Sequence, residues 1–123
     1  MGLKSKSVVT SAMTGLALAW TTVAAGHAFP QREAPGVGSV VHESPKEVRI
    51  WFDAKVEPAF STLVVKDSSG NKISGKSKVD PESSQLLEAN LPALAPGDYH
   101  VYWKVVAWDG HHSEGDYIFT VKP

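Results

Sequence analysis

The 123-residue sequence contains no cysteine, which removes several classes of site at once. Without a thiol there is no disulfide framework, no thiolate zinc site, no iron–sulfur cluster and no cysteine nucleophile. Methionine is almost as scarce, with only Met1 and Met13. Basic residues are not in excess, because 12 Lys and Arg face 13 Asp and Glu, for a formal net charge of −1. That balance gives no electrostatic footprint for nucleic acid, so nucleic-acid binding is not expected.

The first 26 residues have the pattern of a secretory signal peptide. Lys4 and Lys6 precede an apolar stretch over residues 8–19, and small residues follow at 24–26. A basic start, a short apolar run and a small-residue exit are typical of such a leader. Threonine and serine interrupt the run, so it is too short and too polar for a membrane anchor, which needs about 20 mostly apolar residues. The sequence therefore predicts export, with no stable membrane insertion after cleavage.

The cleavage position decides which residue begins the exported protein. Three positions leave small residues where signal peptidase requires them: after Ala25, after Gly26 and after Ala28. Cleavage after Gly26 gives a signal peptide over residues 1–26 and one domain over residues 27–123, with 97 of the 123 residues. His27 is then the first residue and carries a free α-amine beside its imidazole.

The sequence of the predicted domain has the pattern of short β-strands separated by turn residues. β-branched and aromatic segments alternate with clusters of Gly, Pro, Asn and Asp, and no long segment has helical periodicity. This pattern predicts an all-β sandwich or barrel. The expected strands cover residues 48–52, 62–66, 85–91, 99–108 and 117–121, with a weaker candidate at 72–79 and an extended arm at 29–38.

Alternation within these segments predicts which side chains face the core. In the longest expected strand, one side carries Tyr99, Val101, Trp103, Val105 and Ala107, while the other carries His100, Tyr102 and Lys104. We assign the first set to the core, because successive side chains of a strand point to opposite faces of its sheet. By the same argument Val48, Ile50 and Phe52 share one side of their strand.

The histidines are the residues that most clearly indicate a chemical site. There are five: His27, His42, His100, His111 and His112. Asp109 and His111 are two positions apart, so in an extended segment both side chains project to one side and can converge. An N-terminal His27 adds its amine and its imidazole, giving three nitrogens and one carboxylate oxygen. Tetragonal coordination by nitrogen and oxygen is the preference of Cu(II). His112 is a spare imidazole beside this set.

Two other interpretations stay open. Asp109-Gly110 is also a turn signal between strands, so the chain could be a metal-free structural sandwich that acts as an interaction module. Copper-dependent polysaccharide oxygenases also use an N-terminal His on a β-sandwich, but they leave metal positions open for oxygen. Here Asp109 would occupy one such position, which favours binding over catalysis.

Six segments in a fixed order carry a resemblance to a known family. They are His27-Ala28, residues 48–52, residues 61–67, residues 91–106, Asp109-Gly110-His111 and residues 119–121. Together they resemble the CopC-type periplasmic copper-resistance proteins. The match covers most of residues 27–123, although Ala107, Trp108 and His112 depart from the family pattern.

The resemblance implies a seven-stranded, Greek-key, immunoglobulin-like β-sandwich in the periplasm. It implies one Cu(II) per chain, held by the amine and imidazole of His27 together with Asp109 and His111. The implied role is a copper carrier or buffer in copper homeostasis and resistance, not an enzyme. An inner-membrane copper transporter of the CopD type is the implied partner. Some members also have a methionine-rich Cu(I) site, which is not expected here because residues 27–123 contain no methionine.

Overall fold

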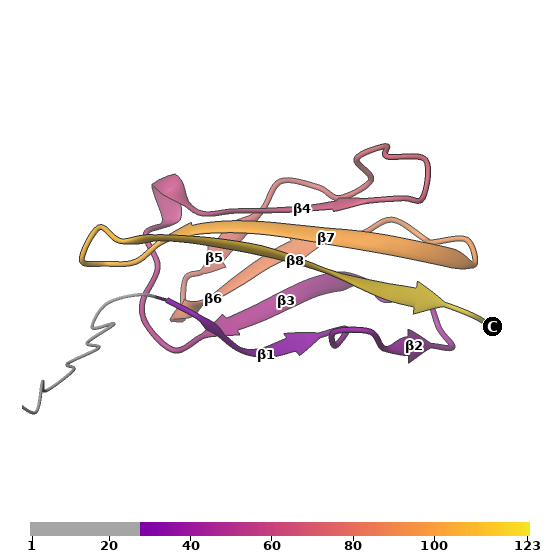
Figure 1. The fold of residues 1–123 in the computed structure, drawn as a ribbon, viewed down its shortest axis with the longest axis horizontal. Coiled ribbons are helices and arrows are strands. Elements are labelled where there is room, and N and C mark those ends of the chain that lie inside the picture. Colours follow the sequence, from indigo (N-terminus) through magenta and orange to yellow (C-terminus); the bar gives the residue numbers. More distant parts are fainter. Residues whose placement is uncertain (1–27) are drawn as a thin grey trace, which may run out of the picture.

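The computed structural model describes residues 28–123, which form two four-stranded β-sheets packed face to face (Figure 1). The first sheet has the order β1-β3-β6-β5 and consists of β1 (Pro30–Ala34), β3 (Glu47–Phe52), β6 (Ser83–Asn90) and β5 (Lys78–Asp80). The second has the order β2-β8-β7-β4 and consists of β2 (Val40–Val41), β8 (His112–Val121), β7 (Gly97–Val106) and β4 (Thr62–Lys66). A single 3-10 turn in this part of the chain, η1 (Pro58–Phe60), leads into β4.

The predicted all-β sandwich is confirmed. Residues 28–123 contain eight strands rather than the seven that the resemblance implies, because the short β2 pairs in parallel with the end of β8. The expected extended arm at 29–38 also contributes a full strand, β1, to the first sheet. None of the helices in the described residues is long and apolar enough to span a membrane. The predicted signal peptide, residues 1–26, lies outside the described residues.

The core lies between the sheets, where the predicted alternation is confirmed. The inward side chains of β3 are buried, and so are those of β7 and the residue that follows it: Val48, Ile50, Phe52, Tyr99, Val101, Trp103, Val105 and Ala107. The Phe52 and Trp103 rings meet edge to face across the two sheets, with centroids 5.2 Å apart. Such aromatic pairs stabilise a core beyond the area they bury.

The hairpin of β7 and β8 is the longest pairing in the described chain. Its register runs without a break from Gly97 opposite Val121 to Val106 opposite His112. β8 therefore begins five residues before the segment 117–121 that the sequence pattern predicts. The first five residues of β8 are polar residues and one glycine. They give no apolar alternation from which this part of the strand could be predicted.

The weak strand predicted at 72–79 is confirmed only at its end, because most of this segment passes from one sheet to the other. At its start the amide of Ile73 donates to the carbonyl of Val65 in β4, which belongs to the second sheet. Two residues later the amide of Gly75 donates to the carbonyl of Asn90 in β6, which belongs to the first. Only Lys78–Asp80 remains as a strand, β5, at the edge of the first sheet.

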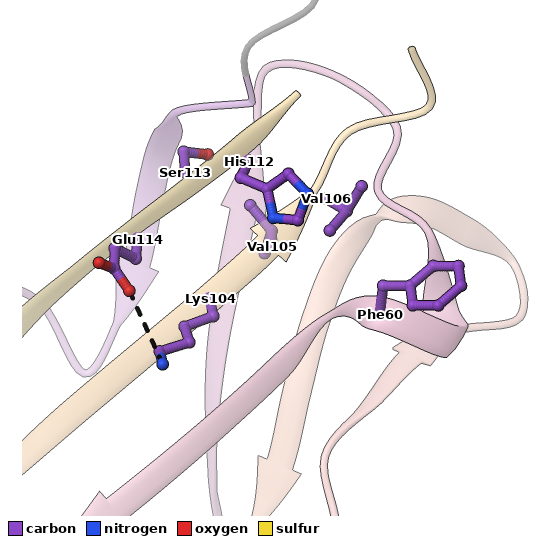
Figure 2. Close-up of a pocket in the computed structure, with 7 residues that line it drawn as sticks. All are labelled: Phe60, Lys104, Val105, Val106, His112, Ser113 and Glu114. Carbon is purple, nitrogen blue, oxygen red and sulfur yellow. Dashed lines mark ion pairs between the residues drawn. The ribbon is translucent and has the colours of Figure 1, made fainter. Parts of the chain in front are cut away.

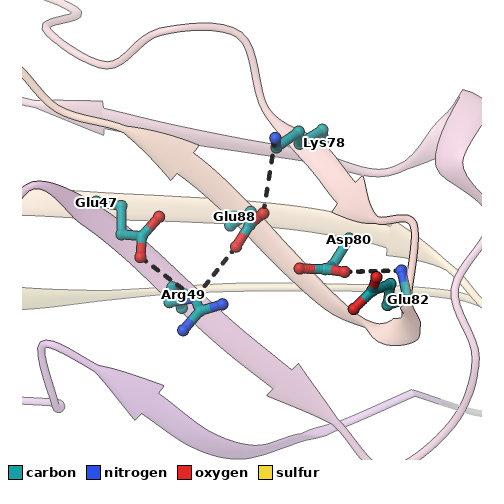
Figure 3. A network of polar contacts seen from close by, with 6 residues as sticks. All are labelled: Glu47, Arg49, Lys78, Asp80, Glu82 and Glu88. Atoms are coloured by element: carbon teal, nitrogen blue, oxygen red, sulfur yellow. Dashed lines mark hydrogen bonds and ion pairs between the residues drawn. The ribbon is translucent and has the colours of Figure 1, made fainter.

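A charged network ties β3, β6 and β5 together on the outer side of the first sheet (Figure 3). The Glu88 side chain is only 8% exposed and accepts a 3.1 Å hydrogen bond from Arg49 Nε. Lys78 Nζ lies 3.9 Å from the same carboxylate, and Glu47 lies 3.5 Å from Arg49 Nε. A nearly buried carboxylate needs such partners, because removing one would leave an uncompensated charge.

Candidate metal centre

The loop that joins β7 to β8 carries two of the predicted ligands. It is a tight hairpin loop, in which Ala107 N–H donates to the His111 carbonyl and Gly110 N–H donates to the Ala107 carbonyl, both at 2.8 Å. Gly110 has a φ of +92°, in the left-handed region that favours glycine. Asp109 and His111 are therefore not part of an extended segment, as the alternation argument assumed. The turn itself brings them together.

Asp109 and His111 contact one another through both the backbone and the side chains. Asp109 Oδ2 lies 2.8 Å from His111 Nδ1, and Asp109 Oδ1 accepts the His111 backbone N–H at 3.2 Å. The side-chain hydrogen bond from His111 lowers the pKa of the Asp109 carboxyl below its ordinary value. An ionised carboxylate can only accept, so Nδ1 carries the proton in this pair. The loop thus holds an anionic oxygen and an oriented imidazole at one point of the surface.

The first described residue, Ala28, is fixed beside this loop. Ser113 Oγ donates a 2.7 Å hydrogen bond to the Ala28 carbonyl, and the Ala28 side chain is fully buried. The next residue is held from the other sheet, because Phe29 N–H donates to Asp53 Oδ1 at 2.8 Å and Asp53 N–H donates to the Phe29 carbonyl at 2.9 Å. Figure 1 shows the start of the described chain at the same end of the sandwich as the β7–β8 loop.

The third predicted ligand, His27, lies outside the described residues. Among residues 28–123 no group of three or more His, Asp or Glu side chains is arranged to hold a metal ion. The structure thus brings Asp109 and His111 together. Sequence reasoning missed Ser113 and Asp53, which anchor Ala28 and Phe29. No local signal marks them, because their partners are 85 and 24 positions away in the chain.

His112 faces a different part of the surface. It begins β8 opposite Val106 and lines a pocket of about 480 Å³ on the outer side of the second sheet (Figure 2). Phe60 of η1 borders the same pocket, and so do Lys104 and Glu114, whose Nζ and Oε2 atoms lie 3.9 Å apart. His112 is thus next to His111 in sequence, but it lines this pocket instead of facing the Asp109–His111 pair.

The two remaining histidines also have partners. His42 Nδ1 lies 2.7 Å from the carbonyl oxygen of Lys122. His100 Nε2 lies 2.6 Å from Asp116 Oδ2, and His100 Nδ1 lies 3.0 Å from the Tyr102 hydroxyl. The sequence pattern places His100 and Tyr102 on the outer face but cannot show the contact with Asp116, because the register between two strands is not visible in either one alone.

Comparison with known sequences agrees with this architecture. Residues 31–122 match the family model of the CopC domain. The sequence is 30% identical over 98 residues to Protein YobA of Escherichia coli strain K12, covering 78% of this chain and 79% of that protein. It is 28% identical over 97 residues to Copper transport protein CutJ of Bacillus subtilis strain 168, covering 77% of this chain but only 18% of CutJ.

Solved structures give the same result. CopC from Methylosinus trichosporium OB3b superposes with a TM-score of 0.75 and is 37% identical, covering 79% of this chain and 95% of that chain. PcoC, a methionine-rich copper resistance protein from Escherichia coli, superposes with a TM-score of 0.70 at 24% identity, covering 78% and 99%. At 24% identity, the similarity to PcoC establishes only the fold.

Proposed function

This chain belongs to the CopC domain family, and we propose that it is an exported copper-binding protein that carries or buffers one Cu(II) ion. The proposal draws on the similarity to the copper transport protein CutJ and to the CopC structure that is 37% identical over the aligned residues. It also draws on the chemistry of the Asp109–His111 pair, since imidazole and carboxylate ligands in a tetragonal arrangement suit Cu(II). The expected biological role is copper homeostasis or resistance.

The proposed ligands are the amine and imidazole of His27, the carboxylate of Asp109 and the imidazole of His111. The observation that carries this set is the hydrogen bond from Ser113 to the Ala28 carbonyl. Ser113 is two residues beyond His111, and His27 precedes Ala28 by one peptide unit, which spans about 3.8 Å between Cα atoms. We therefore infer that an N-terminal residue at position 27 would be within reach of the Asp109–His111 loop.

A carrier role follows from the number of ligands. The four donor atoms would fill the four equatorial positions of a cupric ion, so no strong position remains for a substrate. A catalytic metal site keeps an open position, by analogy with zinc enzymes. We therefore propose that the protein is not an enzyme and that it releases the copper ion chemically unchanged.

The proposed location is the periplasm, reached through cleavage of residues 1–26. A membrane copper transporter of the CopD type is the proposed partner in copper transfer. Residues 28–123 contain no methionine, so the described domain offers no thioether ligands for Cu(I).

The decisive experiment first locates the N-terminus of the exported protein by mass spectrometry. Copper titration then compares that protein with a version that has one alanine added ahead of His27. The amine of the longer protein no longer belongs to His27, so we expect affinity to fall at least about tenfold, which is 1.4 kcal/mol. An exported protein that begins at Phe29, or an unchanged affinity in the extended version, would contradict the proposed ligand set.

A further inference from the structure

A second histidine–aspartate pair lies on the outer face of the β7–β8 hairpin. His100 Nε2 and Asp116 Oδ2 are 2.6 Å apart, and the side chains are 32% and 56% exposed. The Tyr102 hydroxyl lies 3.0 Å from His100 Nδ1, and the two rings stack with centroids 4.2 Å apart. Both imidazole nitrogens of His100 are thus held in defined directions at the protein surface.

The strand register explains why these three side chains meet. Asp116 is directly opposite Tyr102, and His100 is opposite Ile118, so His100 and Asp116 are diagonal neighbours on one face. Long or aromatic side chains at diagonal positions of antiparallel strands are close enough to interact. Asp116 is four residues along β8 from His112, or about 13 Å at the usual rise per residue. The pair is therefore too far from the β7–β8 loop to share its ligands.

We propose that His100 and Asp116 form an accessory, low-affinity site for a divalent transition-metal ion, with Cu(II) the best fit. This site goes beyond the proposed function and does not depend on it. An imidazole nitrogen and a carboxylate oxygen are ligands for this class of ion, and Cu(II) binds such sites most tightly among the common divalent metals. Two ligands about 2.0–2.2 Å from one ion and 2.6 Å from each other subtend about 75–80°, close to neighbouring positions of a tetragonal site.

The tautomer of His100 decides whether Nε2 can bind an ion. In the ion-free pair the Asp116 carboxylate can only accept, so Nε2 carries the proton and Nδ1 accepts from the Tyr102 hydroxyl. When the proton is on Nδ1 instead, it donates to the Tyr102 oxygen and the Nε2 lone pair is free to bind an ion. Binding therefore requires the proton to move from Nε2 to Nδ1, and the ion lies to one side of the line between Nε2 and Oδ2. Water completes its coordination. Tyr102 is a positioning residue here, because a hydrogen bond to the other ring nitrogen orients a metal-binding histidine.

The surroundings keep this site weak. Only two protein ligands take part, and Lys66 Nζ lies 5.3 Å from the centre of the Tyr102 ring, which adds a positive charge nearby. His100 also borders a hollow of about 300 Å³ that Asp67 and Asp98 help to line, so solvent has access to it. The site is therefore expected to fill only when metal is in excess.

The test adds Cu(II) to the exported protein beyond the first equivalent and follows backbone amide signals by NMR. A bound cupric ion broadens signals near it, so the second phase should broaden β7 and β8 around positions 100 and 116. His100→Gln should abolish this phase, Asp116→Asn should weaken it at least tenfold, and Tyr102→Phe should weaken it about tenfold. His42→Gln is the matched control, because it removes another surface histidine and should change neither phase.

The proposal is overturned if the second phase persists in His100→Gln, or if excess Cu(II) broadens the His42 region as strongly as the His100 region. It is also overturned if no second phase appears at millimolar Cu(II). Failure of the proposed function gives a different result. In that case Asp109→Asn does not change the binding of the first equivalent of Cu(II), while His100→Gln still abolishes the broadening around position 100.

Discussion

The Ser113 hydroxyl donates a 2.7 Å hydrogen bond to the Ala28 carbonyl and so joins two residues that are 85 positions apart. This bond ties the first described residue to the start of β8, directly after the loop with Asp109 and His111. It holds Ala28 as a fixed neighbour of that loop. The proposed site takes ligands from residue 27, so it should depend on this bond.

Ser113→Ala should therefore weaken Cu(II) binding without removing any proposed ligand. One hydrogen bond contributes about 0.5–1.5 kcal/mol, so we expect an affinity loss of roughly two- to twelve-fold in a chelator competition assay. Ser39→Ala is the matched control, because its hydroxyl also donates to a backbone carbonyl, that of Gly36, away from the β7–β8 loop. Equal affinities for the two variants would show that the anchor does not matter for the metal.

Asp109→Asn should lower Cu(II) affinity at least about tenfold, because it replaces an anionic ligand with a neutral amide while preserving the shape of the loop. Asp80→Asn is the control, since Asp80 Oδ1 accepts the Glu82 amide at a turn and an asparagine oxygen can do the same. Isothermal titration of both variants beside the parent protein measures the effect. Full affinity in Asp109→Asn would remove this residue from the ligand set.

Lowering the pH from 7 to 5 should weaken Cu(II) binding, because protons compete with the metal for amine and imidazole nitrogens. Asp109 should not contribute to this loss. Its pKa is depressed below 3.8 by the hydrogen bond from His111, so its ionised form persists above that value and is lost only at more acidic pH. Competition titrations at pH 7, 6 and 5 test this, and equal affinities would contradict nitrogen ligation.

Gly115→Ala should destabilise the fold. Gly115 is opposite Trp103, and a Cβ atom built on it would lie 2.5 Å from Trp103 Cζ2, closer than packed atoms approach. Because Trp103 is buried against Phe52, the clash should cost about 1–3 kcal/mol of unfolding free energy, measured by urea denaturation. Gly36→Ala is the control, since the nearest atom to its added Cβ would be 3.8 Å away. A Gly115→Ala protein as stable as this control would mean that Trp103 moves aside freely.

The copper-loaded protein should produce negligible peroxide when supplied with a reductant and oxygen. In the proposed site Asp109 occupies a position that an oxygen-activating centre would keep open. A peroxidase-coupled assay against free Cu(II) at the same concentration measures the rate. Sustained turnover above the free ion would support the oxygenase interpretation instead.

Much of the fold is predictable from local pattern, because alternation along a strand directly records burial. The inward faces of β3 and β7 follow from residues such as Ile50 and Trp103 without knowledge of any partner. The pairing of strands, and the passage of a segment from one sheet to the other, leave no such pattern in the sequence. The segment around Ile73 and Gly75 bonds first to one sheet and then to the other, and only the structure shows this change.

The same distinction applies to the candidate site, where the ligand types are visible in the local sequence but the supporting contacts are not. Asp109 and His111 are recognisable because two ligand types flank a glycine, although a turn rather than an extended backbone brings them together. The roles of Ser113 and Asp116 depend on strand register and on contacts far along the chain. No short motif contains that information.

β8 also separates the two ends of the described chain. Its ten residues extend about 30 Å, with Ala28 held at one end and Val121 at the other (Figure 1). A fluorophore or affinity tag attached at Pro123 would therefore lie at the opposite end of the β7–β8 hairpin from the Asp109–His111 loop (Figure 1). Surface immobilisation through that end should present the loop to solution, whereas a label joined ahead of His27 would block the amine that is proposed as a ligand.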